Sequence, residues 1–183
     1  MPSKLIVLDR DGVINYDSDD YVKSVDEWIP LPGSIEALAK LTQAGFKIAI
    51  ATNQSGISRG YFTVATLDAM HQKMLTLASK AGAKIDYIAY CPHGPDDNCD
   101  CRKPLPGLIH QIEKALNMSA KGCYMVGDSL RDLQAGQAAG LIPALVLTGK
   151  GQRTLDKKSG LASVGVFGDL NSFVDHLLLQ IQQ

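Results

Sequence analysis

The sequence lacks both a large charge imbalance and any long apolar run. Its 183 residues carry 18 basic and 19 acidic side chains, for a formal net charge of −1. A nearly neutral chain offers no electrostatic reason to bind nucleic acid or an anionic membrane surface. No apolar stretch approaches the roughly 20 residues that a membrane-spanning helix requires. We therefore expect neither nucleic acid nor a membrane as a partner.

Cysteine is also scarce, and the first residues do not read as a targeting segment. The stretch MPSKLIVLDRDG lacks the long apolar region and the small-residue cleavage site of a secretory signal peptide. The expected location is therefore the cytoplasm. In that reducing compartment, the four cysteines are more often thiols or metal ligands than disulfides.

The chain does contain a regular alternation of β-branched runs and helical patterns. Strands are expected at residues 4–8, 46–51, 84–90, 123–126 and 142–147, with a short edge strand at 163–167. Between them, apolar residues recur at helical spacing, most clearly between Thr63 and Gly82. This alternation predicts one α/β domain over residues 1–183, a doubly wound parallel sheet with helices on both faces.

Polar residues follow four of the expected strands. In strand order they are Asp9-Arg10-Asp11-Gly12, Thr52-Asn53-Gln54-Ser55-Gly56, a Cys/His cluster followed by Arg102-Lys103, and Gly127-Asp128-Ser129. In an open parallel sheet the ligand site lies beyond the carboxyl ends of the strands. We therefore expect these four strand ends to meet at one crevice.

Three aspartates at these ends have the pattern of a cation site. Asp9 and Asp11 point the same way on an extended chain, and two carboxylates that share a site repel each other. A hard cation relieves that repulsion, and Asp128 supplies a third oxygen ligand. Few protein oxygens suit Mg²⁺, which keeps bound waters and contacts substrate phosphate. A magnesium site at Asp9, Asp11 and Asp128 is therefore expected.

The Cys/His cluster has a different pattern, Cys91-x-His93-x5-Cys99-x-Cys101. A disulfide would leave one of these three cysteines over and His93 unexplained, whereas four such ligands suit tetrahedral Zn²⁺. A fully ligated site has no open position for water, so its expected role is structural. The sequence thus predicts a zinc-binding loop over residues 91–101.

Four motifs between residues 9 and 132 resemble the haloacid dehalogenase superfamily of phosphatases. They are DxDG after the first strand, Thr-Asn after the second, Lys after the third and GDxxxD after the fourth. The resemblance implies a Rossmann-like three-layer fold and Mg²⁺-dependent phosphoryl transfer. The gap between the first motif and the second strand holds one helix, so we expect no large cap domain.

The resemblance also implies a role for each motif residue. Asp9 is expected to attack phosphorus and form an aspartyl-phosphate. Asp11 is expected to protonate the leaving oxygen and then deprotonate water, so it must hold a proton while Asp9 is ionised. Thr52 and Lys103 are expected to stabilise the phosphoryl oxygens. Asp128 is expected to bind Mg²⁺ with Asp9 and the backbone carbonyl of Asp11.

Within the superfamily, DRDGVIN, TNQSGISRG, the cysteine loop with RKP, and GDSLRD are similar to the D-glycero-D-manno-heptose 1,7-bisphosphate phosphatase family. The implied activity removes the 7-phosphate, in a monomeric enzyme that serves heptose biosynthesis for a bacterial surface polysaccharide such as lipopolysaccharide. The implied substrate contacts are Asp17, Asn53, Gln54, Ser55, Arg102 and Ser129.

Two alternatives remain open. Histidinol-phosphatases share DRDG, TNQ and the zinc loop, although the SGISRG segment favours a heptose substrate. A non-catalytic zinc-stabilised binding module on the same scaffold is disfavoured by the intact Asp9, Asp11, Lys103 and Asp128. Arg102 has a planar guanidinium that could hold either a second phosphate or the ring hydroxyls of a sugar.

Overall fold

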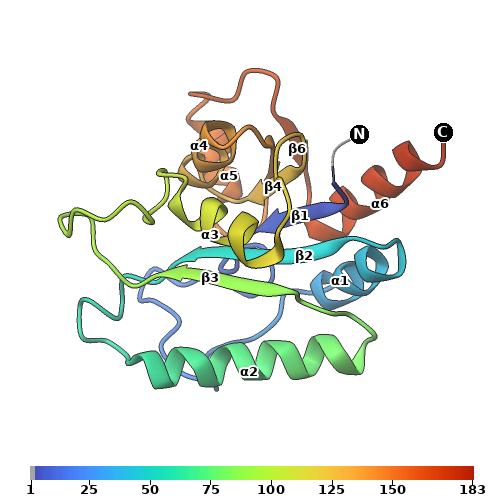
Figure 1. The fold of residues 1–183 in the computed structure, drawn as a ribbon. Coiled ribbons are helices and arrows are strands. Elements are labelled where there is room, and N and C mark those ends of the chain that lie inside the picture. The colour runs from blue at the N-terminus through green and yellow to red at the C-terminus, as the bar shows by residue number, and fades with distance from the viewer. Residues whose placement is uncertain (1–2) are drawn as a thin grey trace.

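The computed structural model describes residues 3–183, and its centre is one parallel sheet (Figure 1). All six strands pair in parallel, in the order β3-β2-β1-β4-β5-β6. They are β1 (Leu5–Leu8), β2 (Lys47–Asn53), β3 (Tyr87–Cys91), β4 (Tyr124–Gly127), β5 (Ile142–Val146) and β6 (Gly165–Phe167). The predicted doubly wound parallel sheet is confirmed.

Helices cover both faces of this sheet. They are α1 (Ser34–Gln43), α2 (Val64–Lys80), α3 (Gly107–Leu116), α4 (Leu130–Ala138), α5 (Gly151–Asp156) and α6 (Leu170–Ile181). The apolar residues of α1, α2 and α6 share one core cluster, and those of α3 and α4 share the other. In Figure 1, α2 runs along the sheet on the side of β3.

Strand β1 shows why its sequence is apolar throughout. Ile6 and Leu8 belong to the cluster under α1 and α2, whereas Leu5 and Val7 belong to the opposite cluster. Side chains alternate across a strand, so a strand covered on both faces needs apolar residues at every position. The next residue, Asp9, is therefore the first position at which the strand can meet water.

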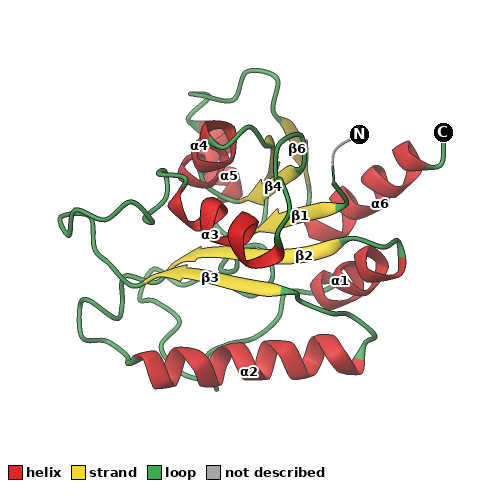
Figure 2. Cartoon of the chain, viewed as in Figure 1, coloured by secondary structure: helices red, strands yellow, loops and turns green. Residues whose placement is uncertain are grey.

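The sheet order fixes where a site can form. From β1 the chain goes outward to β2 and β3, then returns to place β4 on the other side of β1. The strand order reverses between β1 and β4, and this is where open α/β sheets bind ligands. Figure 2 shows the long loops after β1, β2 and β3 gathered at the end to which the strand arrows point.

The structure refines several element boundaries. Thr63 caps α2 as expected, because its hydroxyl accepts a hydrogen bond from the backbone N–H of Thr66 at 3.1 Å. Strand β3 begins later than expected, since the Asp86 carboxylate accepts the N–H of Ile48 at 2.9 Å in place of a ladder carbonyl. Strand β6 is also shorter, because Ser163 has a φ of 61°, which no strand residue can adopt.

The segment between β1 and α1 is a loop rather than an inserted domain. Its regular pairing within residues 9–33 consists of two isolated bridges, Asp11 with Asn15 and Asn15 with Pro30. Trp28, at 0% exposure, anchors this loop in the core, and the Lys73 ammonium of α2 donates to its carbonyl at 2.6 Å. Across residues 3–183, every helix is too short or too polar to traverse a bilayer.

Candidate active site

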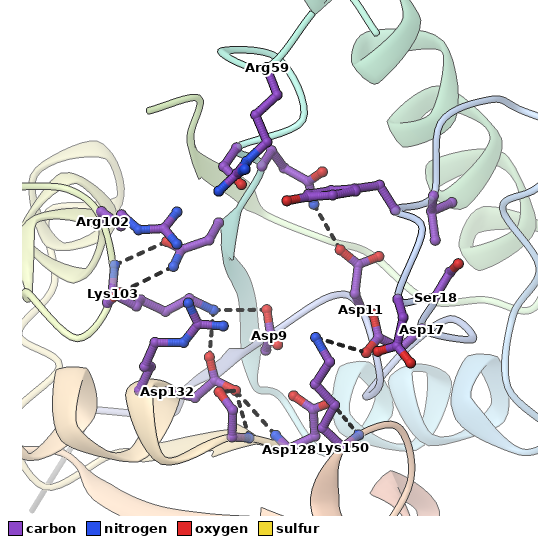
Figure 3. Close-up of a pocket in the computed structure, with 18 residues that line it drawn as sticks. Asp9, Asp11, Asp17, Ser18, Arg59, Arg102, Lys103, Asp128, Asp132 and Lys150 are labelled. Carbon is purple, nitrogen blue, oxygen red and sulfur yellow. Dashed lines mark hydrogen bonds and ion pairs between the residues drawn. The ribbon is translucent and has the colours of Figure 1, made fainter. Parts of the chain in front are cut away.

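A polar cavity of about 320 Å³ lies at the carboxyl ends of the strands (Figure 3). Its lining joins residues that follow five different strands, which confirms that the strand ends meet at one crevice. They include Asp9, Asp11 and Asp17 after β1, Asn53, Gln54, Ser55 and Arg59 from β2, Arg102 and Lys103 after β3, Asp128, Ser129, Arg131 and Asp132 after β4, and Lys150 after β5.

Three buried carboxylates share one end of the cavity with a single lysine. Carboxylate oxygens of Asp9, Asp128 and Asp132 lie within 4.8 Å of one another. The Lys103 ammonium lies 2.8 Å from Asp9 Oδ1 and 2.7 Å from Asp132 Oδ1, and it also donates to the Ala51 carbonyl at 2.8 Å. Three carboxyl groups therefore share one ammonium group at this end.

Asp132 differs from the other two carboxylates because its oxygens are already engaged. Its Oδ1 pairs with Lys103, and its Oδ2 accepts hydrogen bonds from the backbone N–H groups of Asp128 and Ser129 and from the Ser129 hydroxyl. The bond from the Ser129 N–H is one half of the capping box of α4, and in the other half the Ser129 side chain accepts from the backbone N–H of Asp132. Asp132 thus holds Lys103 and the β4 turn in place, and Asp9 and Asp128 are the better cation ligands.

The proton affinities of these two carboxylates support a cation between them. Burial, followed by the charge of Asp132, raises the pKa of Asp9 to about 7, although Lys103 opposes the rise. Burial, then Asp9 and Asp132, raise the pKa of Asp128 well above its usual range. Such crowding is relieved by positive charge. The donor set, buried carboxylate oxygens beside a polar cavity, fits a hard cation such as Mg²⁺.

Asp11 has a different environment from Asp9. Its Oδ1 accepts from Arg10 Nη2 and from Asn15 Nδ2, both at 2.8 Å, and its Oδ2 accepts from Gln54 Nε2 at 3.0 Å. Burial alone would raise its pKa, but the Arg10 charge and these hydrogen bonds lower it. The order of the two pKa values is therefore the reverse of the one expected from the sequence, in which Asp11 holds the proton.

Lys103 is fixed through its backbone as well as through its ammonium. Asn53 Oδ1 accepts the N–H of Lys103 at 3.0 Å, and Asn53 Nδ2 donates to the Lys103 carbonyl at 3.2 Å. Burial would lower the pKa of Lys103, but Asp132 and Asp9 raise it above its usual value. The lysine is therefore charged, and its place is set jointly by β2, β4 and the loop after β3.

Thr52 is the one residue predicted for this site that does not line the cavity. It is fully buried at 0% exposure, and its hydroxyl accepts a hydrogen bond from Gln54 Nε2 at 2.9 Å. Thr52 thus meets the cavity through Gln54, which also holds Asp11. Direct stabilisation of the phosphoryl group by Thr52 stays a prediction.

Three further basic residues line the cavity that sequence reasoning did not assign to it, Arg59, Arg131 and Lys150. Burial, followed by the charge of Arg131, lowers the pKa of Arg102, and Arg59 contributes in the same direction. In Figure 3, Arg59 and Arg102 reach toward the same part of the cavity. Arg131 could have been noted from its position in the first turn of α4, three residues after Asp128.

Lys150 follows β5, whose end is not among the four strand ends expected to form the site. Its backbone N–H donates to Asp128 Oδ2 at 2.9 Å, and its ammonium lies 3.5 Å from Asp17 Oδ2. Two glycines allow this approach, since a Cβ on Gly12, whose φ is +84°, or on Gly149 would overlap the Asp128 carboxylate. The loop after β5 is therefore part of the site.

The Cys/His cluster lies beside this cavity, and its four side chains point toward one another. The Sγ atom of Cys91 lies 3.7 Å from that of Cys99 and 3.6 Å from Nδ1 of His93, which in turn lies 3.4 Å from Cys101 Sγ. A tetrahedral zinc with Zn–S of about 2.3 Å separates two sulfurs by roughly 3.8 Å. The 2.7 Å between Cys91 and Cys101 is shorter, so this pair would open around such an ion.

The thiols of this cluster have pKa values shifted in both directions. Burial would raise the pKa of Cys99, but hydrogen bonds, first from the Arg102 backbone, lower it to about 7. Burial, followed by the neighbouring Cys91 and Cys99 thiols, raises the pKa of Cys101 far above its usual value. Three thiolates at this spacing therefore require a positive charge among them. The four side chains form a group that could hold a metal ion, as the spacing predicted.

Comparison with known proteins places this geometry in a family. A family model for haloacid dehalogenase-like hydrolases matches residues 5–140, which include every strand from β1 to β4. The chain belongs to the haloacid dehalogenase-like hydrolase family. The superfamily resemblance carried by the four motifs is confirmed.

Similar members of this hydrolase family carry a specific name. D-glycero-beta-D-manno-heptose-1,7-bisphosphate 7-phosphatase of Pseudomonas aeruginosa is 52% identical over 178 residues, 97% of this chain and 99% of that protein. The protein of the same name from Neisseria meningitidis is 61% identical over 154 residues, 84% of this chain and 82% of that one.

A solved structure has a similar fold over nearly the whole length of this chain. It is D,D-heptose 1,7-bisphosphate phosphatase from B. bronchiseptica, complexed with magnesium and phosphate. The two share 50% sequence identity with a TM-score of 0.94, over 98% of this chain and 99% of the other. The haloacid dehalogenase-like fold expected from the motifs, a parallel sheet with helices, is confirmed by this match.

Proposed function

We propose that this chain is a Mg²⁺-dependent phosphatase that removes the 7-phosphate from D-glycero-D-manno-heptose 1,7-bisphosphate and releases heptose 1-phosphate. The observation that carries the proposal is the lining of one cavity. It joins Asp9, which pairs with Lys103, to three arginines, Arg59, Arg102 and Arg131, whose like charges act on one another. A substrate with two phosphates can match both the lysine and the arginines. The names of the similar proteins support this substrate and favour its β-anomer.

The magnesium ligands in this proposal are the carboxylates of Asp9 and Asp128 and the backbone carbonyl of Asp11. When bound, the ion neutralises charge on the transferring phosphoryl group. Lys103 takes the same role from the opposite side, where it holds Asp9 Oδ1 at 2.8 Å. Asp9 Oδ2 is thereby left as the attacking oxygen.

The reaction then proceeds in two displacements on the chain's own residues. Asp9 Oδ2 forms a bond to phosphorus while the bond to the C7 oxygen breaks, and Asp11 gives that oxygen a proton. Asp11 next takes a proton from water, whose oxygen attacks the aspartyl-phosphate. Inorganic phosphate leaves, and the Asp9 carboxylate is restored.

The cycle needs Asp11 to hold a proton while Asp9 is ionised, and bound Mg²⁺ and substrate favour that order. Asp9 and Asp128 lose proton affinity when positive charge lies between them, and Asp11 gains it when a phosphate dianion lies beside it. Both changes act against the order seen in the protein alone, where burial and Asp132 raise the pKa of Asp9 and Arg10 lowers that of Asp11.

The second phosphate is assigned to Arg102 with Arg59 and Arg131. Within residues 3–183 none of these three guanidinium groups forms an ion pair with a carboxylate. Three positive charges that repel one another in the lining of one cavity gain from an anion there. Asp17, Asn53, Gln54, Ser55 and Ser129 remain the proposed contacts to the sugar and the reacting phosphate.

The Cys/His cluster is assigned to structural Zn²⁺, held by Cys91, His93, Cys99 and Cys101. Cys101 directly precedes Arg102, whose Nη1 donates to the His93 carbonyl at 3.2 Å. A closed zinc site would thus fix both the arginine and the adjacent lysine. A monomer in the cytoplasm, where these thiols stay reduced, completes the proposal.

One assay series tests the substrate. The purified protein with Mg²⁺ is given the β- and α-anomers of heptose 1,7-bisphosphate and histidinol phosphate, and kcat/KM is compared. We expect the bisphosphate to be preferred by at least about tenfold, with the β-anomer ahead. A preference for histidinol phosphate would instead assign the chain to that activity, and no phosphate release from any of the three would remove the enzymatic proposal.

A further inference from the structure

Arg10 separates the two aspartates of the first motif, and it is fully buried, at 0% exposure. Alternation along the strand places it on the face of Ile6 and Leu8, under α1 and α2. Its guanidinium turns back to Asp11, with Nε at 3.2 Å and Nη2 at 2.8 Å from Oδ1. A buried guanidinium needs partners for all its N–H groups, so the third nitrogen identifies what else it binds.

That third nitrogen meets a histidine from a distant part of the chain. Arg10 Nη1 lies 3.2 Å from Nε2 of His71, which stands 61 positions later, on the buried face of α2. A guanidinium can only donate, so Nε2 accepts and the ring proton lies on Nδ1. Burial, followed by the Arg10 charge, lowers the pKa of His71 to about 3, which keeps the ring neutral.

The contacts from His71 through Arg10 end on Asp11 Oδ1, which leaves Oδ2 as the oxygen available for proton transfer. Arg10 and Asn15 hold Oδ1, whereas Oδ2 accepts a weaker set, a single hydrogen bond from Gln54, which lines the cavity. The carboxylate is thus clamped on one oxygen and presents the other. A proton donor works only when its oxygen lies within hydrogen-bond reach of the leaving group.

We propose that His71 and Arg10 are a pair of positioning residues for Asp11: His71 orients the Arg10 guanidinium, which fixes the Asp11 carboxylate for proton transfer to the leaving oxygen. The inference rests on the proposed function in one respect, that Asp11 is the proton donor. It makes helix α2, which lies along one sheet face in Figure 1, a support of the chemistry.

The test exploits the leaving group, since only a poor one needs a proton in the transition state. The variants His71→Leu and His71→Gln are compared on a primary alkyl phosphate, glycerol 3-phosphate, and on p-nitrophenyl phosphate, whose leaving group departs unprotonated. The parameter is kcat/KM, which ends at leaving-group departure and so excludes later hydrolysis. Neither substrate is a heptose, so the outcome is independent of the proposed substrate.

We expect His71→Leu to lower kcat/KM on glycerol 3-phosphate by about 10- to 100-fold and on p-nitrophenyl phosphate by less than about threefold. His71→Gln, whose amide oxygen can accept from Arg10 in place of Nε2, is expected to recover most of the loss. Gln72→Leu, on the exposed face of the same helix, is the matched control and should change neither value.

Equal losses on both substrates, or no loss in a folded His71→Leu variant, would overturn the proposal. If that variant does not fold, nitrogen NMR of the unaltered protein decides instead. The expected spectrum at pH 7 shows His71 as a neutral ring with the proton on Nδ1. A proton on Nε2, which could not accept from Arg10, would equally overturn it.

Discussion

Two groups of metal-ligating side chains lie side by side in this protein, and they differ in what they leave open. The aspartates at the ends of β1 and β4 are hard oxygen ligands beside a polar cavity, with a lysine among them. The Cys/His cluster of residues 91–101 has four ligands that face one another. We infer that the aspartates, which leave coordination positions open, form the reacting site. The Cys/His cluster, whose four ligands can fill a tetrahedral ion, has a structural role.

The largest expected effect comes from the open group. Asp9→Asn removes the proposed nucleophile and should lower kcat/KM on any phosphate ester by at least about 10⁴-fold. The melting temperature should not fall, because one of three crowded carboxylates loses its charge. Asp20→Asn, at an exposed loop position, is the control and should retain full activity. An active Asp9→Asn variant would move the nucleophile elsewhere.

Disrupting the Cys/His cluster should lower activity less than removing Asp9, because the cluster acts by holding other residues in place. Cys99→Ser is expected to release zinc, lower the melting temperature and reduce kcat/KM by about 10- to 100-fold, because Arg102 and Lys103 lose their anchor. Extra Mg²⁺ should not restore the activity. Cys123→Ser, a change outside the cluster, should retain zinc. Zinc loss with unchanged activity would separate the cluster from the site altogether.

A smaller effect is expected where the closed group meets the substrate. Arg102→Ala should raise KM for heptose 1,7-bisphosphate by about tenfold, while kcat/KM on p-nitrophenyl phosphate stays within about twofold. The reason is that Arg102 is assigned to the second phosphate, which the aryl substrate lacks. Arg153→Ala, an exposed arginine, serves as the control. An equal loss on both substrates would assign Arg102 to the reacting phosphate.

The smallest effect is expected from a substitution outside both the aspartates and the Cys/His cluster. Thr63→Ala removes the side-chain cap of α2, whose hydroxyl accepts from Thr66 at 3.1 Å. We expect the free energy of unfolding to fall by about 1 kcal/mol. Activity should be unchanged in the folded protein. Denaturant unfolding with a parallel assay measures both, and a large loss of activity would show that the start of α2 supports the site as well.

Much of the site could be predicted from the sequence because it lies at strand ends. Asp9 and Asp128 each directly follow a buried strand, and parallel strands bring such positions together wherever the sheet forms. Lys103 comes from the loop after β3 and was found through its motif. The cysteine spacing was equally informative, since its four ligands lie within one loop. In both cases short-range order along the chain determines which atoms meet.

The rest depends on contacts between distant segments. Arg59 and Lys150 reach the cavity from the loops after β2 and β5, and Arg131 reaches it from the first turn of α4. Residue spacing does not predict how loops bend or which way a helix side chain points. The reversed pKa order follows from the burial of Asp9 beside Asp132 and from the buried Arg10 guanidinium beside Asp11. Residue spacing predicts neither of these contacts. Thr52 likewise turned out to contact Gln54 rather than the cavity.

The central claim is that the aspartates carry a catalytic Mg²⁺ and that the cysteine loop carries a structural Zn²⁺. It is tested most directly by measuring metal content and activity together, as a weak chelator and then single metals are applied to the purified protein. We predict that activity disappears with magnesium and returns with added Mg²⁺, while zinc stays at about one per chain. Activity that follows zinc content, and returns with Zn²⁺ in the absence of Mg²⁺, would contradict the account.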